Sequence, residues 1–208
     1  MAKHLIFDFE TLDNRSYNRP VVPSVAFLVF DPEVLMSFDQ LVDNSLRIKF
    51  DISEQLQHGR KYNQETVDWW RKPDNSEAYK KVIEVDGSEV GLGQLDSLLK
   101  EYLIEMEYDP GKGKVWTRGN SFDVPILDNI YEDFGWDPAF SWWNVRDIRT
   151  EIDAITPHFD STHAGYGYIK DFPYPKGFIK HQETHDVSRD VLMMQQAHIQ
   201  LMTKMGII

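Results

Sequence analysis

The sequence predicts an α/β domain built on a mixed sheet. Three short apolar runs follow one another within residues 4–50, which is the pattern of an antiparallel meander. Helical and strand patterns then alternate, and a long helical run closes the chain. Strands followed by alternating helices and strands are typical of α/β domains. We therefore expect one domain over residues 1–208, with five strands in a mixed sheet flanked by helices.

The strands are expected at residues 4–9, 24–30, 41–50, 115–117 and 142–145. The first, HLIFDF, is apolar around a single acid, and the second, SVAFLVF, ends at Asp31-Pro32. The third has a mixed pattern.

The helices are expected at residues 63–71, 91–107, 121–133, 147–154 and 186–205. Leucines in the second of these recur at i, i+3 and i+4, which is the spacing of an amphipathic helix. Asn63 and Asp147 are suited to cap the helices that follow them. Residues 156–181 are rich in Gly, Pro, His and aromatic residues, so we expect a long irregular loop there.

Composition excludes several classes of protein. The formal charge is −12, from 34 acidic and 22 basic residues, which argues against a broad basic face that coats nucleic acid. The absence of cysteine excludes a disulfide scaffold, a thiol nucleophile and a cysteine-based zinc finger. No apolar stretch approaches the roughly 20 residues that span a bilayer, and no signal peptide is expected. We expect a cytoplasmic protein with no membrane partner.

Asp8 and Glu10 lie two residues apart on the first predicted strand. Side chains alternate along a strand, so both carboxylates point to one face. Two carboxylates on a buried strand are costly unless a cation neutralises them, and oxygen ligands without cysteine favour Mg²⁺ or Mn²⁺. A strand end that reaches solvent, or an ordinary salt bridge, remains an alternative.

Three further residues could join them. Asp123 falls in the first turn of a predicted helix, where a carboxylate also suits the helix dipole. His185 and Asp190 lie five residues apart, which on a helix separates them by about 140°. If both serve one site, His185 must reach in from a loop while Asp190 sits on the helix. The alternative for Asp190 is an exposed acid paired with Arg189 or Lys180.

Together these motifs resemble the DEDDh class of 3′→5′ exonucleases. D-x-E on the first strand, Asp after the fourth strand and H-x4-D at the last helix have the order and separation of that class, from about Lys3 to Met205. FDFETLDN, VDWW, RGNSFDVPIL, WWNVRDIRT and HDVSRDVLMM are similar to the exonuclease A group of T-even phages and to related bacterial exoribonuclease-like domains. Many members carry Asn four residues before the second-motif Asp, whereas this chain has Gly119 there and Asn120 next to it.

The resemblance implies a ribonuclease-H-like fold and hydrolysis with two metal ions. It implies that Asp8 bridges both ions and that Asp123 serves one of them through waters. Glu10 and Asp190 would hold the ion that binds the attacking water, and His185 would take that water's proton. The expected cofactors are two Mg²⁺ ions, with Mn²⁺ able to substitute.

The resemblance also implies a single-stranded DNA or RNA 3′ end as the partner, with DNA favoured and a 3′→5′ exoribonuclease as the alternative. The products would be nucleoside 5′-monophosphates. The candidate substrate-binding residues are Thr11, Leu12, Trp69, Trp70 and Asn120. The two tryptophans face about 100° apart on a helix, so one can pack in the core while the other stacks on a base. A monomer is expected, although an edge strand could pair two chains. If the chain is phage-encoded, it would act in the host cytoplasm.

Two other functions remain open. His181 and His185 are four residues apart and, with His158 or His163, could form the zinc site of a hydrolase, but glycines and prolines break that region. A catalytically silent nucleic-acid-binding module is the other, and the presence of all five candidate catalytic residues argues against it.

We also interpret residues 156–181 as a flap that positions His185.

Overall fold

The computed structural model describes residues 2–155, 167–169 and 171–207. Its strands form one sheet in the order β3-β2-β1-β4-β5. They are β1 (His4–Glu10), β2 (Ser24–Phe30), β3 (Leu46–Lys49), β4 (Val115–Thr117) and β5 (Val145–Asp147). The pairs β1–β2 and β2–β3 are antiparallel, whereas β1–β4 and β4–β5 are parallel. The mixed five-stranded sheet predicted from the sequence is therefore confirmed.

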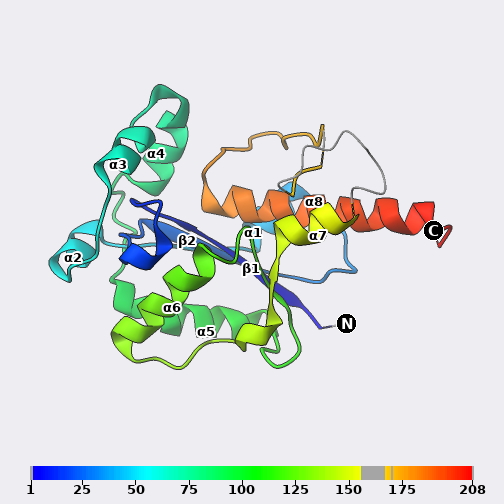
Figure 1. Cartoon of the computed structure of the whole chain (residues 1–208), viewed down its shortest axis with the longest axis horizontal. Coiled ribbons are helices and arrows are strands. Elements are labelled where there is room, and N and C mark those ends of the chain that lie inside the picture. Colours follow the sequence, from blue (N-terminus) through cyan, green and yellow to red (C-terminus); the bar gives the residue numbers. More distant parts are fainter. Residues whose placement is uncertain (1, 156–166, 170, 208) are drawn as a thin grey trace.

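Helices cover both faces of this sheet (Figure 1). They are α1 (Phe38–Asp43), α2 (Ile52–Gln57), α3 (Gln64–Trp70), α4 (Ser76–Val82), α5 (Leu95–Glu105), α6 (Asp123–Phe134), α7 (Ile148–Ile155) and α8 (Glu183–Lys204). One core cluster packs the sheet against α5 and α6, and a second packs it against α1, α7 and α8. In the described part of the chain, no helix is both long and apolar enough to span a bilayer.

The alternation of β1 fixes where its acids point. Leu5, Phe7 and Phe9 pack in the cluster on the α5–α6 side, and Ile6 packs in the cluster on the α8 side. Side chains two residues apart share a face of a strand. Asp8 and Glu10 therefore continue the face of Ile6 and point towards α8.

Two predicted strands are shorter than expected. Residues 41–50 divide into the end of α1 and the short strand β3. Ser37 and Gln40 form a capping box that starts α1, and this local signal overrides the mixed strand pattern. The strand expected at 142–145 begins with a 3-10 turn at Trp142–Asn144 and becomes β5 only from its last residue. The short helices α2 and α4 were not predicted.

The final helix begins earlier than expected, at Glu183 instead of residue 186. Of the predicted loop 156–181, residues 156–166 and 170 lie outside the described residues, and so do His158 and His163 of the zinc alternative. The expected flap is thus described only in part.

Candidate active site

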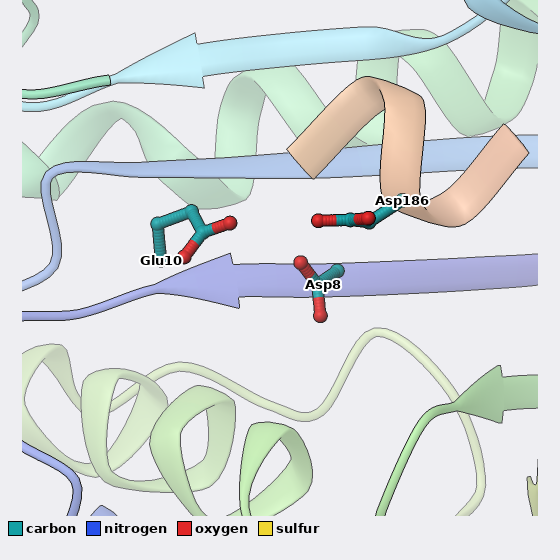
Figure 2. A group of neighbouring side chains, drawn as sticks. All are labelled: Asp8, Glu10 and Asp186. Atoms are coloured by element: carbon teal, nitrogen blue, oxygen red, sulfur yellow. The ribbon is translucent and has the colours of Figure 1, made fainter. Parts of the chain in front are cut away.

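Three carboxylates from β1 and α8 form the centre of the site. Asp8 and Glu10 project from β1, and Asp186 projects from the first turn of α8. Each offers one oxygen, and these oxygens all lie within 4.8 Å of one another. Figure 2 shows the three side chains gathered between the strand and the helix. Among the described residues, no lysine or arginine forms an ion pair with any of them.

Burial and crowding disfavour their ionisation. Burial raises the pKa of Asp8 well above its usual value, and the charges of Asp123 and Asp186 raise it further. Burial followed by the charge of Asp8 does the same to the pKa of Glu10. Burial raises the pKa of Asp186 to about 7, with the charge of Asp190 as the next cause. A divalent cation would relieve this repulsion, and carboxylate oxygens are the ligands that Mg²⁺ and Mn²⁺ prefer. The donor set therefore fits such an ion.

Asp123 completes the acidic wall, in the first turn of α6 as predicted. Its Oδ1 accepts a hydrogen bond from the Phe9 backbone N–H at 3.0 Å, and only 2% of the residue is exposed. Burial raises the pKa of Asp123 to about 7, against the lowering effect of that hydrogen bond. The hydrogen bond ties α6 to β1 between the two strand acids.

Asp190 reaches the same cavity but already has a cationic partner. Arg118 Nε donates to both carboxylate oxygens, at 2.9 and 2.8 Å, and Arg118 Nη2 donates to Oδ1 at 2.6 Å. Both side chains are largely buried. The partner considered from the sequence, Arg189 or Lys180, is replaced by Arg118, which comes from the end of β4.

His185 lies in the first turn of α8, not in a loop as expected. Its Nδ1 accepts a hydrogen bond from the Ile179 backbone N–H at 2.8 Å. The ring packs edge-on against Phe38, and it is not among the residues that line the cavity. Burial lowers the pKa of His185, and the charges of Arg47 and Lys81 lower it further. Because α8 begins at Glu183, the helix carries this ring away from the carboxylates.

His181 lines the cavity instead. It precedes α8 with a φ of 63°, and its ring meets Trp69 edge-on at 4.8 Å. Its backbone N–H donates to the Asp186 carboxylate, and burial lowers the pKa of the His181 ring to about 4. The sequence holds two overlapping H-x4-D patterns, His181–Asp186 and His185–Asp190. The predicted motif is the second pair, whereas both residues of the first pair line the cavity.

The cavity between these groups has a volume of about 590 Å³ and is lined by both acidic and basic side chains. The acids are Asp8, Glu10, Asp123, Asp186 and Asp190, and the bases are Arg118, Arg149, Lys180 and Arg189. The Arg189 guanidinium lies 4.4 Å from the ring of Tyr174, which holds the segment before α8 against that helix. Carboxylates that can bind cations lie beside basic side chains that can bind phosphates, and this combination suits a phosphodiester.

A neighbouring hollow of about 440 Å³ shares Phe9, Glu10 and Phe122 with the cavity. Thr11 and Trp69 line it. Trp70 reaches its wall but is a core residue, only 1% exposed, whose Nε1 donates to the Thr11 carbonyl at 3.0 Å. Of the adjacent tryptophans, one is therefore in the core and the half-buried Trp69 is available beside the hollow.

The other two substrate-binding candidates lie elsewhere. Leu12 is buried in the core cluster that includes Trp70. Asn120 is engaged in its own turn, where its Oδ1 accepts from Thr117 Oγ1 at 2.8 Å and its N–H donates to Asp147. Neither residue lines the cavity or the hollow.

A cavity of about 650 Å³ beside α6 is a poorer candidate. Its lining is mostly apolar, including Leu127, Phe140 and Trp142, and Asp128 is its one ionisable carboxylate among the described residues. Size alone therefore does not mark the site.

Comparisons with known proteins agree with this geometry. The model of a family described as the 3′-5′ exoribonuclease Rv2179c-like domain matches residues 3–166. The chain is also 35% identical to an exodeoxyribonuclease of enterobacteria phage T4 over 214 residues, which covers 92% of this chain and 87% of the phage protein. The matched family range ends before α8, so it does not include either H-x4-D pattern.

Solved structures share the fold at low sequence identity. A zinc-bound complex of E. coli ExoI with single-stranded DNA has a TM-score of 0.60 at 12% identity, over 96% of this chain and 41% of that one. Cell-death related nuclease 4 has a TM-score of 0.52 at 14% identity, over 99% of this chain and 65% of that one. This chain thus spans less than half of the ExoI chain. These likenesses confirm the ribonuclease-H-like exonuclease fold.

Proposed function

Because the chain belongs to the Rv2179c-like 3′-5′ exoribonuclease domain family and is therefore a 3′→5′ exonuclease, we propose that it releases nucleoside 5′-monophosphates from the 3′ end of a single strand. The observation that carries the proposal is the group of Asp8, Glu10 and Asp186. Their oxygens lie within 4.8 Å of one another at the wall of an open cavity.

We propose two Mg²⁺ ions as cofactors, with Mn²⁺ able to substitute. Asp8, Glu10 and Asp123 would hold them, together with one acid of α8. When bound, such ions neutralise the scissile phosphate and lower the pKa of the attacking water. The chain itself fixes these carboxylates, offers Trp69 to the terminal base and supplies a histidine that accepts the water's proton. The sequence motif assigns the acid and the histidine of α8 to Asp190 and His185.

Single-stranded DNA is the substrate we favour. We propose that the enzyme acts in the cytoplasm, which would be the host cytoplasm if the chain is phage-encoded. The 35% identical phage relative, which covers most of both chains, is an exodeoxyribonuclease and supports this choice. The description of the family favours RNA 3′ ends as the second candidate. The difference between the two polymers is the 2′-hydroxyl, so the preference depends on what that group meets.

A time course on matched 3′-labelled single-stranded DNA, RNA and duplexes, with Mg²⁺ and with EDTA, tests the proposal. We expect Mg²⁺-dependent release of mononucleotides from the 3′ end, fastest on single-stranded DNA. Faster release from RNA would reverse the choice of polymer. No metal-dependent release from any of them, with Asp8→Asn behaving like the unchanged protein, would refute the proposed function.

A further inference from the structure

We propose that His181 and Asp186 are the histidine and the α8 carboxylate of the exonuclease site, and that Asp190 is a structural partner of Arg118. This assignment rests on the proposed function and deepens it. Both H-x4-D pairs fit the sequence spacing, so spacing cannot choose between them. The residue at which α8 begins distinguishes the two pairs.

Asp186 and Asp190 lie four residues apart on α8, so both face the sheet. The helix rises about 6 Å between them, and this places them against different neighbours. Asp186 meets Asp8 and Glu10, with all three oxygens within 4.8 Å. Among the described residues, the backbone N–H of His181 donates a hydrogen bond to Asp186. The carboxylate therefore keeps oxygen lone pairs for an ion.

The carboxylate of Asp190 is committed to Arg118 through three hydrogen bonds of 2.6–2.9 Å. The guanidinium is itself held in place, because Nη1 donates to the Gly167 carbonyl at 2.9 Å and the group lies 4.3 Å from the Tyr168 ring. Moving Asp190 onto a metal ion would leave a largely buried guanidinium without its counter-charge, which is costly. Asp186 can bind an ion without breaking such a pair.

The histidines differ in the same way. Nδ1 of His185 accepts from Ile179, so a neutral ring carries its proton on Nε2 and has no lone pair left for the proton of a water. The ring also contacts Phe38 and Phe178, and it is outside the cavity lining. The His181 ring lines the cavity, and it forms no hydrogen bond with any side chain or backbone group of the described residues. Its position just before the first turn of α8 sets it next to Asp186.

Metal binding separates the two acids without relying on turnover. We would titrate Mn²⁺ into the full chain by calorimetry for Asp186→Asn and Asp190→Asn, with circular dichroism to confirm folding. We expect Asp186→Asn to weaken binding at least tenfold and Asp190→Asn to change it less than about threefold. The reverse order, or an equal loss in both, would overturn the assignment.

Asp190→Asn leaves Arg118 without a counter-charge and can unfold the chain for that reason alone. The double variant Arg118→Met, Asp190→Leu removes the pair as a unit, which a buried site tolerates better. We expect this double variant to fold and to bind Mn²⁺ within about threefold of the unchanged chain. A folded double variant that has lost Mn²⁺ binding would refute the structural role of Asp190.

The histidines are compared by hydrolysis rate at saturating Mg²⁺, with Mn²⁺ affinity as the control. We expect His181→Gln to slow release of mononucleotides by about 10²–10⁴ while Mn²⁺ affinity is kept, the range for loss of a general base. We expect less than a tenfold loss for His185→Gln, and the opposite pattern would overturn the choice of histidine. An unchanged chain that binds Mn²⁺ but hydrolyses nothing would sink the proposed function and leave the ligand assignment of Asp186 standing.

Discussion

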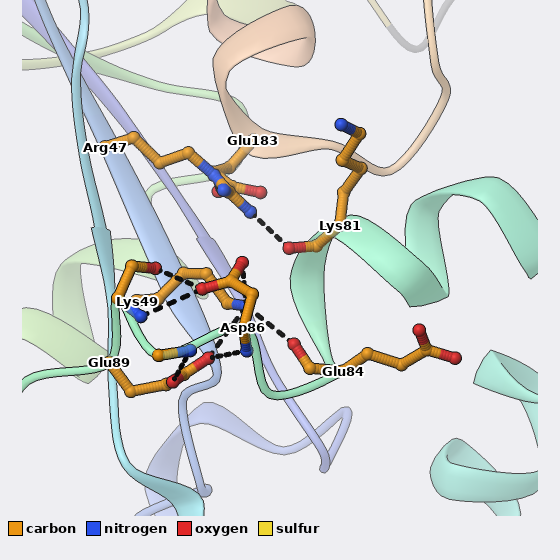
Figure 3. Close-up of polar contacts among 9 residues, drawn as sticks. Arg47, Lys49, Lys81, Glu84, Asp86, Glu89 and Glu183 are labelled. Atoms are coloured by element: carbon orange, nitrogen blue, oxygen red, sulfur yellow. Dashed lines mark hydrogen bonds and ion pairs between the residues drawn. The ribbon is translucent and has the colours of Figure 1, made fainter.

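Two groups of acids near β3 and α8 have opposite surroundings. The paired group consists of Asp86, Glu89 and Glu183. Asp86 and Glu89 both pair with the buried Lys49, at 2.8 and 2.9 Å, and Glu183 pairs with Arg47 (Figure 3). The unpaired group of Figure 2, made of Asp8, Glu10 and Asp186, has no cation from the described chain.

The pKa values follow this difference. The hydrogen bond from Lys49 holds the pKa of Asp86 well below its usual range, whereas burial raises the pKa of Asp186 to about 7. Glu183 and Asp186 lie three residues apart on one helix, yet only Glu183 meets an arginine. Acids that the fold needs are thus neutralised by the fold itself. Acids that lie together without a cation from the chain are available to bind a metal ion. Four changes test this comparison.

The largest expected effect is on turnover, at Asp8. Asp8→Asn should lower the rate of mononucleotide release at least about 10³-fold, because the carboxylates of such a site act as a unit. Its unfolding temperature without metal should not fall, since the change relieves repulsion among the unpaired acids. Rates on labelled single-stranded DNA and a thermal melt in EDTA measure both. A variant with near-normal turnover would contradict the metal role of the unpaired group.

The next effect is on stability, at Arg47. Arg47→Met leaves the fully buried Glu183 without its cation, which should cost about 3 kcal/mol, or roughly 6–12 °C in a chain of this size. Mg²⁺ should not restore it, because the lost charge belongs to the fold. Thermal melts with and without Mg²⁺ measure this. Adding Glu183→Gln should recover part of the loss, and a double variant no better than the single one would show that charge is not the cause.

The pH dependence of the metal-free chain should reveal the buried carboxylates that line the cavity. Asp123 and Asp186 have a folded pKa of about 7, above the value of about 4 of an unfolded carboxyl. The folded state therefore binds more protons between pH 4 and 7, and the stability from these groups falls as pH rises through that window. Melts in EDTA from pH 5 to 8 should show a falling unfolding temperature, which Mg²⁺ restores at pH 8. A rise over that range in EDTA would contradict the raised pKa values.

The smallest effect is expected at Asp86, a half-exposed member of the paired group. Asp86→Asn keeps Glu89 as a partner for Lys49, so the unfolding temperature should fall by less than about 2 °C. Turnover should stay within about twofold, which makes this variant the matched control for Asp8→Asn. A large loss of turnover would show that the two groups are coupled.

The position of the carboxylates of β1 and α6 was predictable because the sequence patterns that place them are local. The alternation of β1 places Asp8 and Glu10 on one face, and Asp123 follows a strand at the start of a helix. The residues that were misplaced depend on where a helix begins. α1 displaced part of a predicted strand, and the early start of α8 turned His185 away from the cavity and brought Asp186 into it.

The sequence by itself determined the mixed sheet, the D-x-E strand and the presence of a carboxylate site. Only the tertiary structure decided which acids have a cation. Arg118 meets Asp190 across 72 residues and Arg47 meets Glu183 across 136. Side-chain alternation is set by neighbouring residues, whereas an ion pair requires two distant segments to be packed together, and a single sequence carries no direct signal of that packing.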